Sequence, residues 1–183
     1  MPEAELKARV RVPEDVTRRL EARGAGRAEV YQDTYYDDQA RTLAARDAEL
    51  RVRTVHGAGG TRSLLTFKDA TVDEASGSKP EHGTRVEGVE ALHETLRRLG
   101  YIPVIAFEKR CRNYDIRARG REMLATLVRV PEIDGTFIEV ETLVEDGAAV
   151  EDALKDVSDV LAELGVGEGD MTSELYTDAV AGI

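Results

Sequence analysis

The sequence is poor in cysteine and in long apolar runs. Its one cysteine, Cys111, cannot form an intrachain disulfide, so we expect a reducing, cytoplasmic location. No apolar run approaches the roughly 20 residues that cross a bilayer. The first residues, MPEAELKARVRV, are too charged for a secretory signal. A disulfide scaffold, a membrane-spanning protein and an exported protein are therefore not predicted.

An excess of basic residues is also lacking. The chain has 25 Lys and Arg residues against 36 Asp and Glu residues, which gives a formal net charge of −11. A protein that binds the phosphate backbone needs a basic face, so we expect no nucleic-acid partner. The 183 residues are 42% apolar, which is enough for one hydrophobic core. This predicts a single domain over 1–183 and excludes general disorder.

Hydrophobic periodicity predicts both helices and strands. Apolar residues at helical spacing predict helices over 13–23, 89–99 and 150–164, with a short one over 173–181. Alternating segments predict strands over 3–12, 30–37, 49–56, 62–69, 104–115, 121–130 and 136–144. Because strands outnumber helices, we predict an α+β fold with a largely antiparallel sheet or barrel.

Two glycine-containing segments separate predicted elements. HGAGGT, residues 56–61, predicts a hairpin turn and lacks the Lys-Ser/Thr ending of a P-loop. EASGSKPEHGT, residues 74–84, is polar and predicts a flexible connection. No phosphate site is predicted at HGAGGT.

One face of several predicted strands is charged, because side chains i and i+2 share a strand face. Such faces are ordinarily solvated, but these are long, rich in Arg and interrupted by two carboxylate pairs. If the sheet closes on itself, they line a tunnel whose cations need a polyanion such as triphosphate. The carboxylates would then offer hard oxygen ligands to Mg²⁺ or Mn²⁺. In chain order these faces carry Glu3, Glu5, Lys7, Arg9, Arg11, Arg51, Arg53, Thr66, Lys68, Glu108, Arg110, Arg112, Tyr114, Glu139 and Glu141.

The same residues carry a family resemblance. Glu3-x-Glu5-x-Lys7 resembles the ExExK signature of the CYTH group, which includes class IV adenylyl cyclases and triphosphate-tunnel hydrolases. Five motifs in the family's order are far more specific than ExExK alone, and they extend through nearly the whole chain. The further matching segments are TYYD (34–37), LRVR (50–53), LLTFK (64–68), EKRCRNY (108–114) and GTFIEVE (135–141).

The resemblance implies an eight-stranded antiparallel β-barrel that forms a tunnel, with helices packed outside. It implies one or two divalent ions, Mg²⁺ or Mn²⁺, held by Glu3, Glu5, Glu139 and Glu141. It assigns catalysis to Glu5, Lys7 and Glu141. It assigns phosphate binding to Lys7, Arg51, Arg53, Lys68, Arg110 and Arg112. Cyclase-like relatives are commonly dimers, so a homodimer is a further expectation.

The chain departs from the family pattern at one position. Relatives usually carry an Asp shortly before the closing strand, where this sequence has Val128 or Thr126. Two more positions, Lys79 and Glu81, stand where relatives have a denser Arg/Glu strand, and their roles stay open. For Lys109 and Arg9, a phosphate contact and a solvated or cross-paired charge are weighed equally.

Other reactive side chains are given structural roles. The three histidines, His56, His82 and His93, have no zinc-ligand spacing. Cys111 lies on the strand face opposite Arg110 and Arg112, which predicts a packed thiol. Tyr176 resembles a C-terminal Tyr segment of the family, and both packing and substrate contact stay open for it.

These observations predict an enzyme that acts on a triphosphate with a divalent metal. Cyclisation of ATP to cyclic AMP and pyrophosphate is the first reading, because the motif spacing resembles class IV cyclases. Hydrolysis of tripolyphosphate, thiamine triphosphate or a nucleoside triphosphate is the alternative, since it needs the same groups. A non-catalytic polyphosphate- or nucleotide-binding module is a further alternative, favoured by the absent Asp and opposed by the two Glu pairs. A purely structural domain explains neither charged feature.

Overall fold

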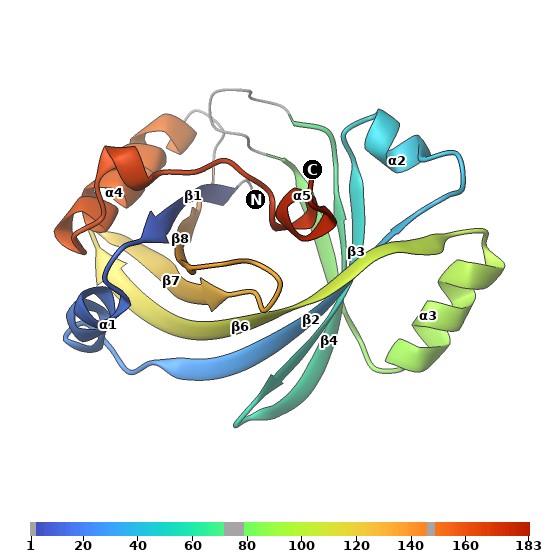
Figure 1. Cartoon of the computed structure of the whole chain (residues 1–183), viewed down its shortest axis with the longest axis horizontal. Coiled ribbons are helices and arrows are strands. Elements are labelled where there is room, and N and C mark those ends of the chain that lie inside the picture. Colours follow the sequence, from blue (N-terminus) through green and yellow to red (C-terminus); the bar gives the residue numbers. More distant parts are fainter. Residues whose placement is uncertain (1–2, 72–78, 146–148) are drawn as a thin grey trace.

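One antiparallel sheet of eight strands organises the chain in the computed structural model, which describes residues 3–71, 79–145 and 149–183. The sheet curls into a half-barrel with β1 and β5 at its two ends (Figure 1). The predicted α+β fold with eight antiparallel strands is confirmed. In sheet order the strands are β1 (Glu3–Val10), β8 (Thr136–Leu143), β7 (Arg121–Arg129), β6 (Ile102–Ala118), β2 (Arg27–Asp37), β3 (Glu49–Gly57), β4 (Gly60–Lys68) and β5 (Glu81–Val86).

The helices agree with the predicted ones, with one addition. The four-residue α2 was not predicted, because it is too short to show a periodic pattern. Two helices, α1 and α4, lie on the outer side of the curled sheet, α3 packs against β2 and β3, and α5 lies at its open side (Figure 1). Their bounds are α1 (Pro13–Glu21), α2 (Thr42–Ala45), α3 (Val89–Arg98), α4 (Val150–Glu163) and α5 (Tyr176–Ala181), with a 3₁₀ turn, η2, at Glu168–Asp170.

Two connections were predicted with different success. The β3–β4 hairpin is confirmed: Gly57 pairs with Gly60, and the left-handed φ of +105° at Gly60 suits a residue without a Cβ. The predicted connection over 74–84 is wrong at its end, since Glu81 already belongs to β5. Residues 74–78 lie outside the described part. Gly83 has a low strand propensity, which is why alternation did not reveal this edge strand.

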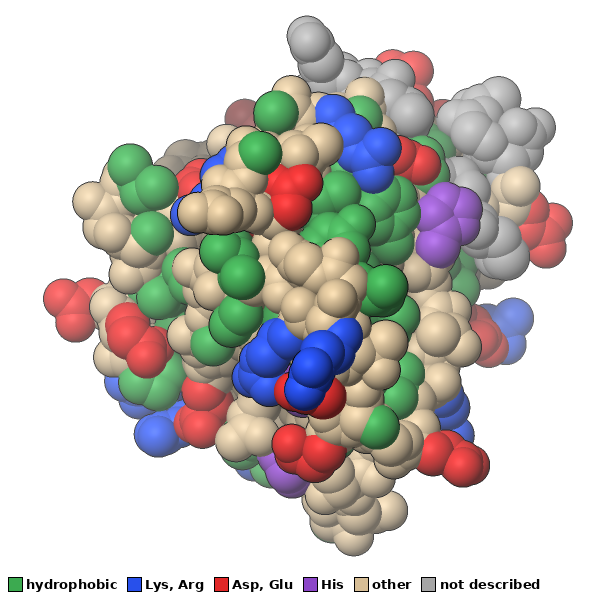
Figure 2. Space-filling model, turned by 90° about the vertical axis from the view of Figure 1, so that its right-hand side faces the viewer, with side chains coloured by type: hydrophobic (Ala, Val, Ile, Leu, Met, Phe, Trp, Pro, Cys, Tyr) green, Lys and Arg blue, Asp and Glu red, His purple; other side chains and the backbone are tan. Residues whose placement is uncertain are grey.

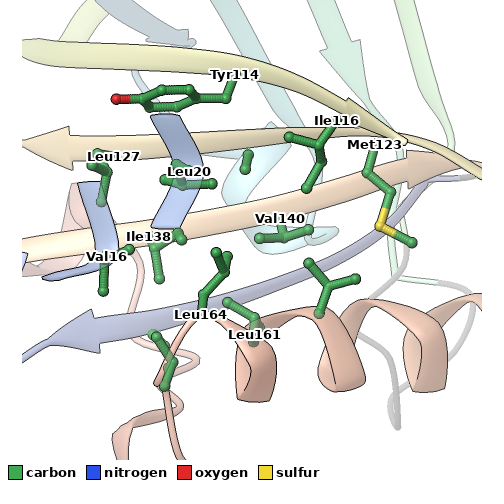
Figure 3. Packing of buried hydrophobic residues seen from close by; sticks show 14 of the residues in the cluster. Val16, Leu20, Tyr114, Ile116, Met123, Leu127, Ile138, Val140, Leu161 and Leu164 are labelled. Atoms are coloured by element: carbon green, nitrogen blue, oxygen red, sulfur yellow. The ribbon is translucent and has the colours of Figure 1, made fainter. Parts of the chain in front are cut away.

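The main hydrophobic core lies between the outer face of the sheet and helices α1 and α4 (Figure 3). Leu20 of α1 and Leu161 of α4 are fully buried against Ile138 and Val140 of β8. Full burial of each such side chain contributes roughly 1.5–3 kcal/mol. Because neighbouring strand residues point to opposite faces, burying Ile138 and Val140 turns Glu139 toward the inner face.

A smaller hydrophobic cluster determines which side chains face inward in the other half of the sheet. Val52 of β3 is buried with Tyr36 of β2 and Leu96 of α3. Their burial turns Arg51 and Arg53 toward the inner face. The side of the molecule that carries α2 and α3 displays apolar, acidic and basic side chains interspersed, without a continuous basic surface (Figure 2).

Candidate functional site

Four glutamates form what we call the acidic wall of the inner face: Glu3, Glu5, Glu139 and Glu141. Strands β1 and β8 are antiparallel neighbours, and their register places Glu5 opposite Glu141 and Lys7 opposite Glu139. Directly opposite residues share a face with Cβ atoms about 4.5–5.5 Å apart. The two predicted carboxylate pairs therefore meet on one concave surface, although they are far apart in the sequence.

Crowding and burial keep protons on part of this wall. Burial, with help from Glu139, raises the pKa of Glu5 to about 7. Burial together with Glu3 and Glu5 raises the pKa of Glu141 to about 8. Burial also raises the pKa of Glu3, followed by the charge of Glu81. Each carboxylate thus resists ionisation because no sufficient positive charge stands beside it.

Glu139 differs from the other three glutamates because a cationic side chain lies beside it. Burial alone would raise its pKa, but Lys109, together with smaller effects of Tyr176 and Arg53, outweighs burial and the pKa is lowered. Lys109 Nζ lies 3.1 Å from Glu139 Oε1, and the lysine side chain is only 8% exposed. This ion pair joins the acidic wall to the cations of the facing strands.

Those cations form what we call the basic wall: Arg51, Arg53, Lys68 and Lys109. Lys68 Nζ lies 3.2 Å from Glu81 Oε2, and Arg53 makes an ion pair with Asp33. Arg51 Nε is buried and has no hydrogen-bond partner within the described part of the chain. A buried donor without a partner is costly, so a ligand oxygen would find a prepared contact there.

Lys7 lies between the two walls and contacts the C-terminal segment. Its ammonium is 4.2 Å from the ring centroid of Tyr176, and Lys109 Nζ is 4.6 Å from the same ring. Phe137 packs edge-on against this ring at 5.5 Å. Lys7 also donates a hydrogen bond to the main-chain oxygen of Glu174. Tyr176 therefore packs inside the half-barrel, against two of its cations.

The predicted inward face of β6 is wrong. Arg110 and Arg112 lie on the outer face, where they pair with Glu108 and Glu21 at 2.9 and 3.0 Å. On the same side of β6, Tyr114 packs into the core with α1 and α4. The inner face instead presents three buried residues, Lys109, Cys111 and Asn113. Arg110 and Arg112 therefore do not join the basic wall, and Lys109 does.

The position of the missing family Asp holds no carboxylate. Thr126 and Val128 are both buried on the inner face of β7. Thr126 donates to Asn113 Oδ1 at 2.8 Å, and Asn113 donates in turn to Glu29 at 2.6 Å and to the Tyr31 hydroxyl at 2.8 Å. Val128 packs in an apolar cluster with Phe107 and Phe137. This part of the inner face satisfies its own polar groups.

The remaining predicted residues lie outside the two walls. Lys79 pairs with Asp47 at 2.7 Å, and Arg9 pairs with Glu174 at 3.6 Å, so both are cross-paired. His56 hydrogen-bonds Gln32 at 2.9 Å. His93 lies 2.6 Å from the hydroxyl of Tyr36. Burial raises the pKa of the Cys111 thiol to about 12, which argues against a thiolate nucleophile.

Asp33 was missed by the sequence reasoning. It lies on the inner face of β2, opposite Arg53 in the strand register. The available signal was an acidic residue between Tyr31 and Tyr35, on a strand face that also carries Glu29. Pattern alone cannot match such a residue with a partner on another strand.

The acidic wall suits a divalent cation in its chemistry. Its four carboxylates are hard oxygen donors on one surface, and the raised pKa values of Glu3, Glu5 and Glu141 show that these three lack sufficient positive charge nearby. Over residues 3–71, 79–145 and 149–183, no three His, Cys, Asp or Glu side chains stand close enough to form a preformed cage. The donor set therefore fits such an ion, and binding requires the glutamate side chains to turn toward it.

The inner face next to the acidic wall is hollowed into a cavity of about 560 Å³. Both acidic and apolar side chains line it. They include Glu3, Asp115, Glu122, Leu124, Glu141 and Leu143. Because Glu3 and Glu141 belong to both features, a molecule in this cavity would touch the acidic wall.

None of the described helices is long and apolar enough to span a membrane.

A candidate adenylate cyclase of Methanocaldococcus jannaschii is 21% identical over 180 residues, covering 97% of this chain and 98% of that protein. Among solved structures, a protein of Pyrococcus horikoshii OT3 has a TM-score of 0.86 at 28% identity, with 98% of each chain covered.

A second similar structure comes from Hippeastrum. It is a candidate adenylyl cyclase reported to have a dominant triphosphatase activity, with a TM-score of 0.68 at 17% identity over 100% of this chain and 96% of that chain. The family model of the CYTH domain matches residues 1–176. With the two walls in place on the inner face of the half-barrel, the chain belongs to the CYTH domain family.

Proposed function

We propose that this protein is a divalent-metal-dependent enzyme that acts on a triphosphate. One observation carries the proposal: strand register brings two carboxylate pairs and a set of lysines and arginines together on one concave face. A triphosphate matches the basic wall, and a divalent cation matches the acidic wall. Family membership supports the same reading.

The basic wall and Lys7 would hold the phosphate chain. Arginine offers paired N–H donors to phosphate oxygens, and lysine offers a compact positive charge. Arg51 has the clearest unmet need, because its buried Nε lacks a partner in the described part of the chain. Lys7 and Lys109 both contact the Tyr176 ring, so displacing this ring would uncover two ammonium groups at once.

Glu3, Glu5, Glu139 and Glu141 would hold Mg²⁺ or Mn²⁺. Such an ion supplies positive charge that offsets the phosphate oxygens and lowers the pKa of an attacking hydroxyl or water. For this role the glutamates must be ionised. The raised pKa values of Glu5 and Glu141 mean that protons and the cation compete for these two side chains.

The reaction we favour is cyclisation of ATP to cyclic AMP and pyrophosphate. The ribose 3′-hydroxyl attacks the α-phosphorus, and the pyrophosphate that leaves stays on the basic wall. The cavity beside Glu3 and Glu141 provides room for the nucleoside next to the acidic wall. The name of the M. jannaschii relative supports this reading. A substrate of this kind agrees with a cytoplasmic enzyme.

Hydrolysis of a triphosphate is the second candidate, supported by the activity reported for the Hippeastrum relative. It needs the same two walls, with water in place of the ribose hydroxyl. A non-catalytic binding module is the third candidate. The absence of a carboxylate at Thr126 and Val128 supports it.

Phosphorus NMR distinguishes these candidates. The purified protein is incubated with Mg²⁺ or Mn²⁺ and either ATP or tripolyphosphate, and Glu141→Gln serves as the matched inactive control. Pyrophosphate with cyclic AMP would support the cyclase, and orthophosphate the hydrolase. No product from either substrate, together with a raised melting temperature, would leave the binding module. The absence of both a product and a thermal shift would contradict the proposal.

A further inference from the structure

Asp33 is a buried carboxylate among cations. Its side chain is fully buried, and it lies on β2 directly opposite Arg53 of β3. Arg51 and Lys109 are the next positive charges that act on it.

The contact between Asp33 and Arg53 is bidentate. Arg53 Nε donates to Oδ1 and Arg53 Nη2 donates to Oδ2, each at 2.6 Å. The guanidinium also stacks over Tyr31, 4.5 Å from the ring centroid. Burial alone would raise the pKa of Asp33, but the hydrogen bonds from Arg53 bring it below its ordinary value. The carboxylate is therefore ionised and fixed on Arg53.

This geometry leaves part of the guanidinium available. Asp33 takes one N–H from Nε and one from Nη2, while Nη1 makes no hydrogen bond to any described residue. A guanidinium held along one edge can rotate very little, so its free N–H groups keep a constant direction. In the lysine pairs of the basic wall one ammonium nitrogen makes every contact, at 3.1 and 3.4 Å for Lys109 and 3.2 Å for Lys68, so these pairs lack this constraint.

We propose that Asp33 is a positioning residue for triphosphate binding: it fixes the Arg53 guanidinium so that the free N–H groups face the phosphate chain. The proposal rests on the proposed function of the two walls. Its alternative is that Asp33 only lowers the positive charge of the site. These roles predict opposite effects on affinity.

The first test is the affinity for tripolyphosphate with Mg²⁺, measured by calorimetry for the wild type and Asp33→Asn. Loss of the carboxylate makes the site more positive by one charge. Positioning predicts binding about tenfold weaker, because the guanidinium is released. Charge balancing predicts tighter binding, and that result, or an unchanged affinity, would overturn the proposal. Absence of binding by the wild type would instead contradict the proposed function.

Glu21→Gln is the matched control. It also converts a carboxylate that binds an arginine into an amide, but its partner Arg112 lies on the outer face. We expect its affinity to remain within twofold of the wild type. A comparable weakening in this control would show that Asp33→Asn acts through a general loss of stability, and would overturn the positioning role.

A double-mutant cycle tests whether Asp33 acts through Arg53. Arg53→Met should weaken binding, and adding Asp33→Asn should change the affinity by less than twofold more. If the two losses multiply, Asp33 acts independently and the proposal fails.

If Asp33→Asn does not fold, a measurement on the wild-type protein still tests the positioning role. The Arg53 Nε–H signal in nitrogen-15 NMR, assigned with Arg53→Lys, should remain slow to exchange when tripolyphosphate binds. Rapid exchange would show that Arg53 leaves Asp33 on binding.

Discussion

The acidic wall and the basic wall share one concave face, but their charges are balanced differently. In the basic wall, Lys68, Lys109 and Arg53 each have a carboxylate partner at 2.6–3.2 Å. In the acidic wall, only Glu139 has an ion-pair partner among the described residues. The basic wall is thus largely neutralised by the protein itself, while the acidic wall is relieved by taking up protons.

This difference indicates which wall depends more on its ligand. A neutralised cation binds phosphate only when the phosphate displaces or joins its carboxylate, so this wall gives selectivity rather than bulk attraction. An acidic wall without neighbouring cations is stabilised by any divalent ion that binds to it. The formal net charge of −11 therefore conceals two surfaces with opposite requirements.

The largest expected effect comes from neutralising the acidic wall. Glu5→Gln should lower metal-dependent turnover by about 100-fold or more, because a carboxylate ligand is lost. Steady-state rates over a range of Mg²⁺ concentrations measure this. Glu108→Gln on the outer face is the control and should keep wild-type rates. Full activity of Glu5→Gln would remove this residue from the metal site.

A smaller effect is expected on stability, where removing a charge should help. The pKa values of about 7 for Glu5 and about 8 for Glu141 exceed the ordinary 4.5, so the folded protein binds more protons than the unfolded one between these limits. Without metal, the free energy of unfolding should fall as pH rises from about 4.5 to about 8, by at least about 3 kcal/mol.

Glu141→Gln should flatten that pH profile and raise the melting temperature at pH 8. Urea denaturation across this pH range, with and without Mg²⁺, provides the measurement. The added ion should stabilise the wild type more than the variant. A variant as pH-sensitive as the wild type would contradict the unbalanced acidic wall.

A moderate effect is expected from the basic wall. Lys109→Met should raise KM for the triphosphate about tenfold, because one cation is lost at the contact between the two walls. Lys155→Met is the control, since Lys155 is exposed on α4, on the outer side of the sheet. If both variants behave alike, the loss reflects long-range charge instead of a contact.

The smallest effect is expected from Arg110→Met. Arg110 lies on the outer face in an exposed ion pair with Glu108, and such pairs contribute about 0–1 kcal/mol. KM should stay within twofold of the wild type, and the melting temperature should hardly change. A tenfold rise in KM would restore Arg110 to the phosphate site and contradict the observed strand face.

The sequence predicted those parts of the site that alternation determines. In β1, β3 and β8 the charged residues alternate with small or branched apolar ones, so only one face can be buried against helices. In β6 both faces carry cations, and alternation cannot choose between Lys109 and its neighbour Arg110. Tyr114 was available as a signal, because it shares the Arg110 face and packs against α1 and α4.

Other features depend on contacts between distant segments. The Asp33–Arg53 ion pair needs the register of β2 against β3, which no local pattern contains. The position of Tyr176 against Lys7 depends on how the C-terminal segment crosses the sheet. Sequence reasoning thus recovers the faces of strands better than it recovers partners.

The pairing of β1 with β8 also governs when the site can form. Glu5 and Glu141 are direct partners across this strand pair, so a ribosome makes one carboxylate long before the other. Closing so large a loop is slow compared with forming local hairpins such as β3–β4. During synthesis β1 remains unpaired until β8 has been made. The alternating charges of β1 keep this unpaired strand from associating with other chains. The glutamates that we propose as metal ligands therefore also protect the nascent chain.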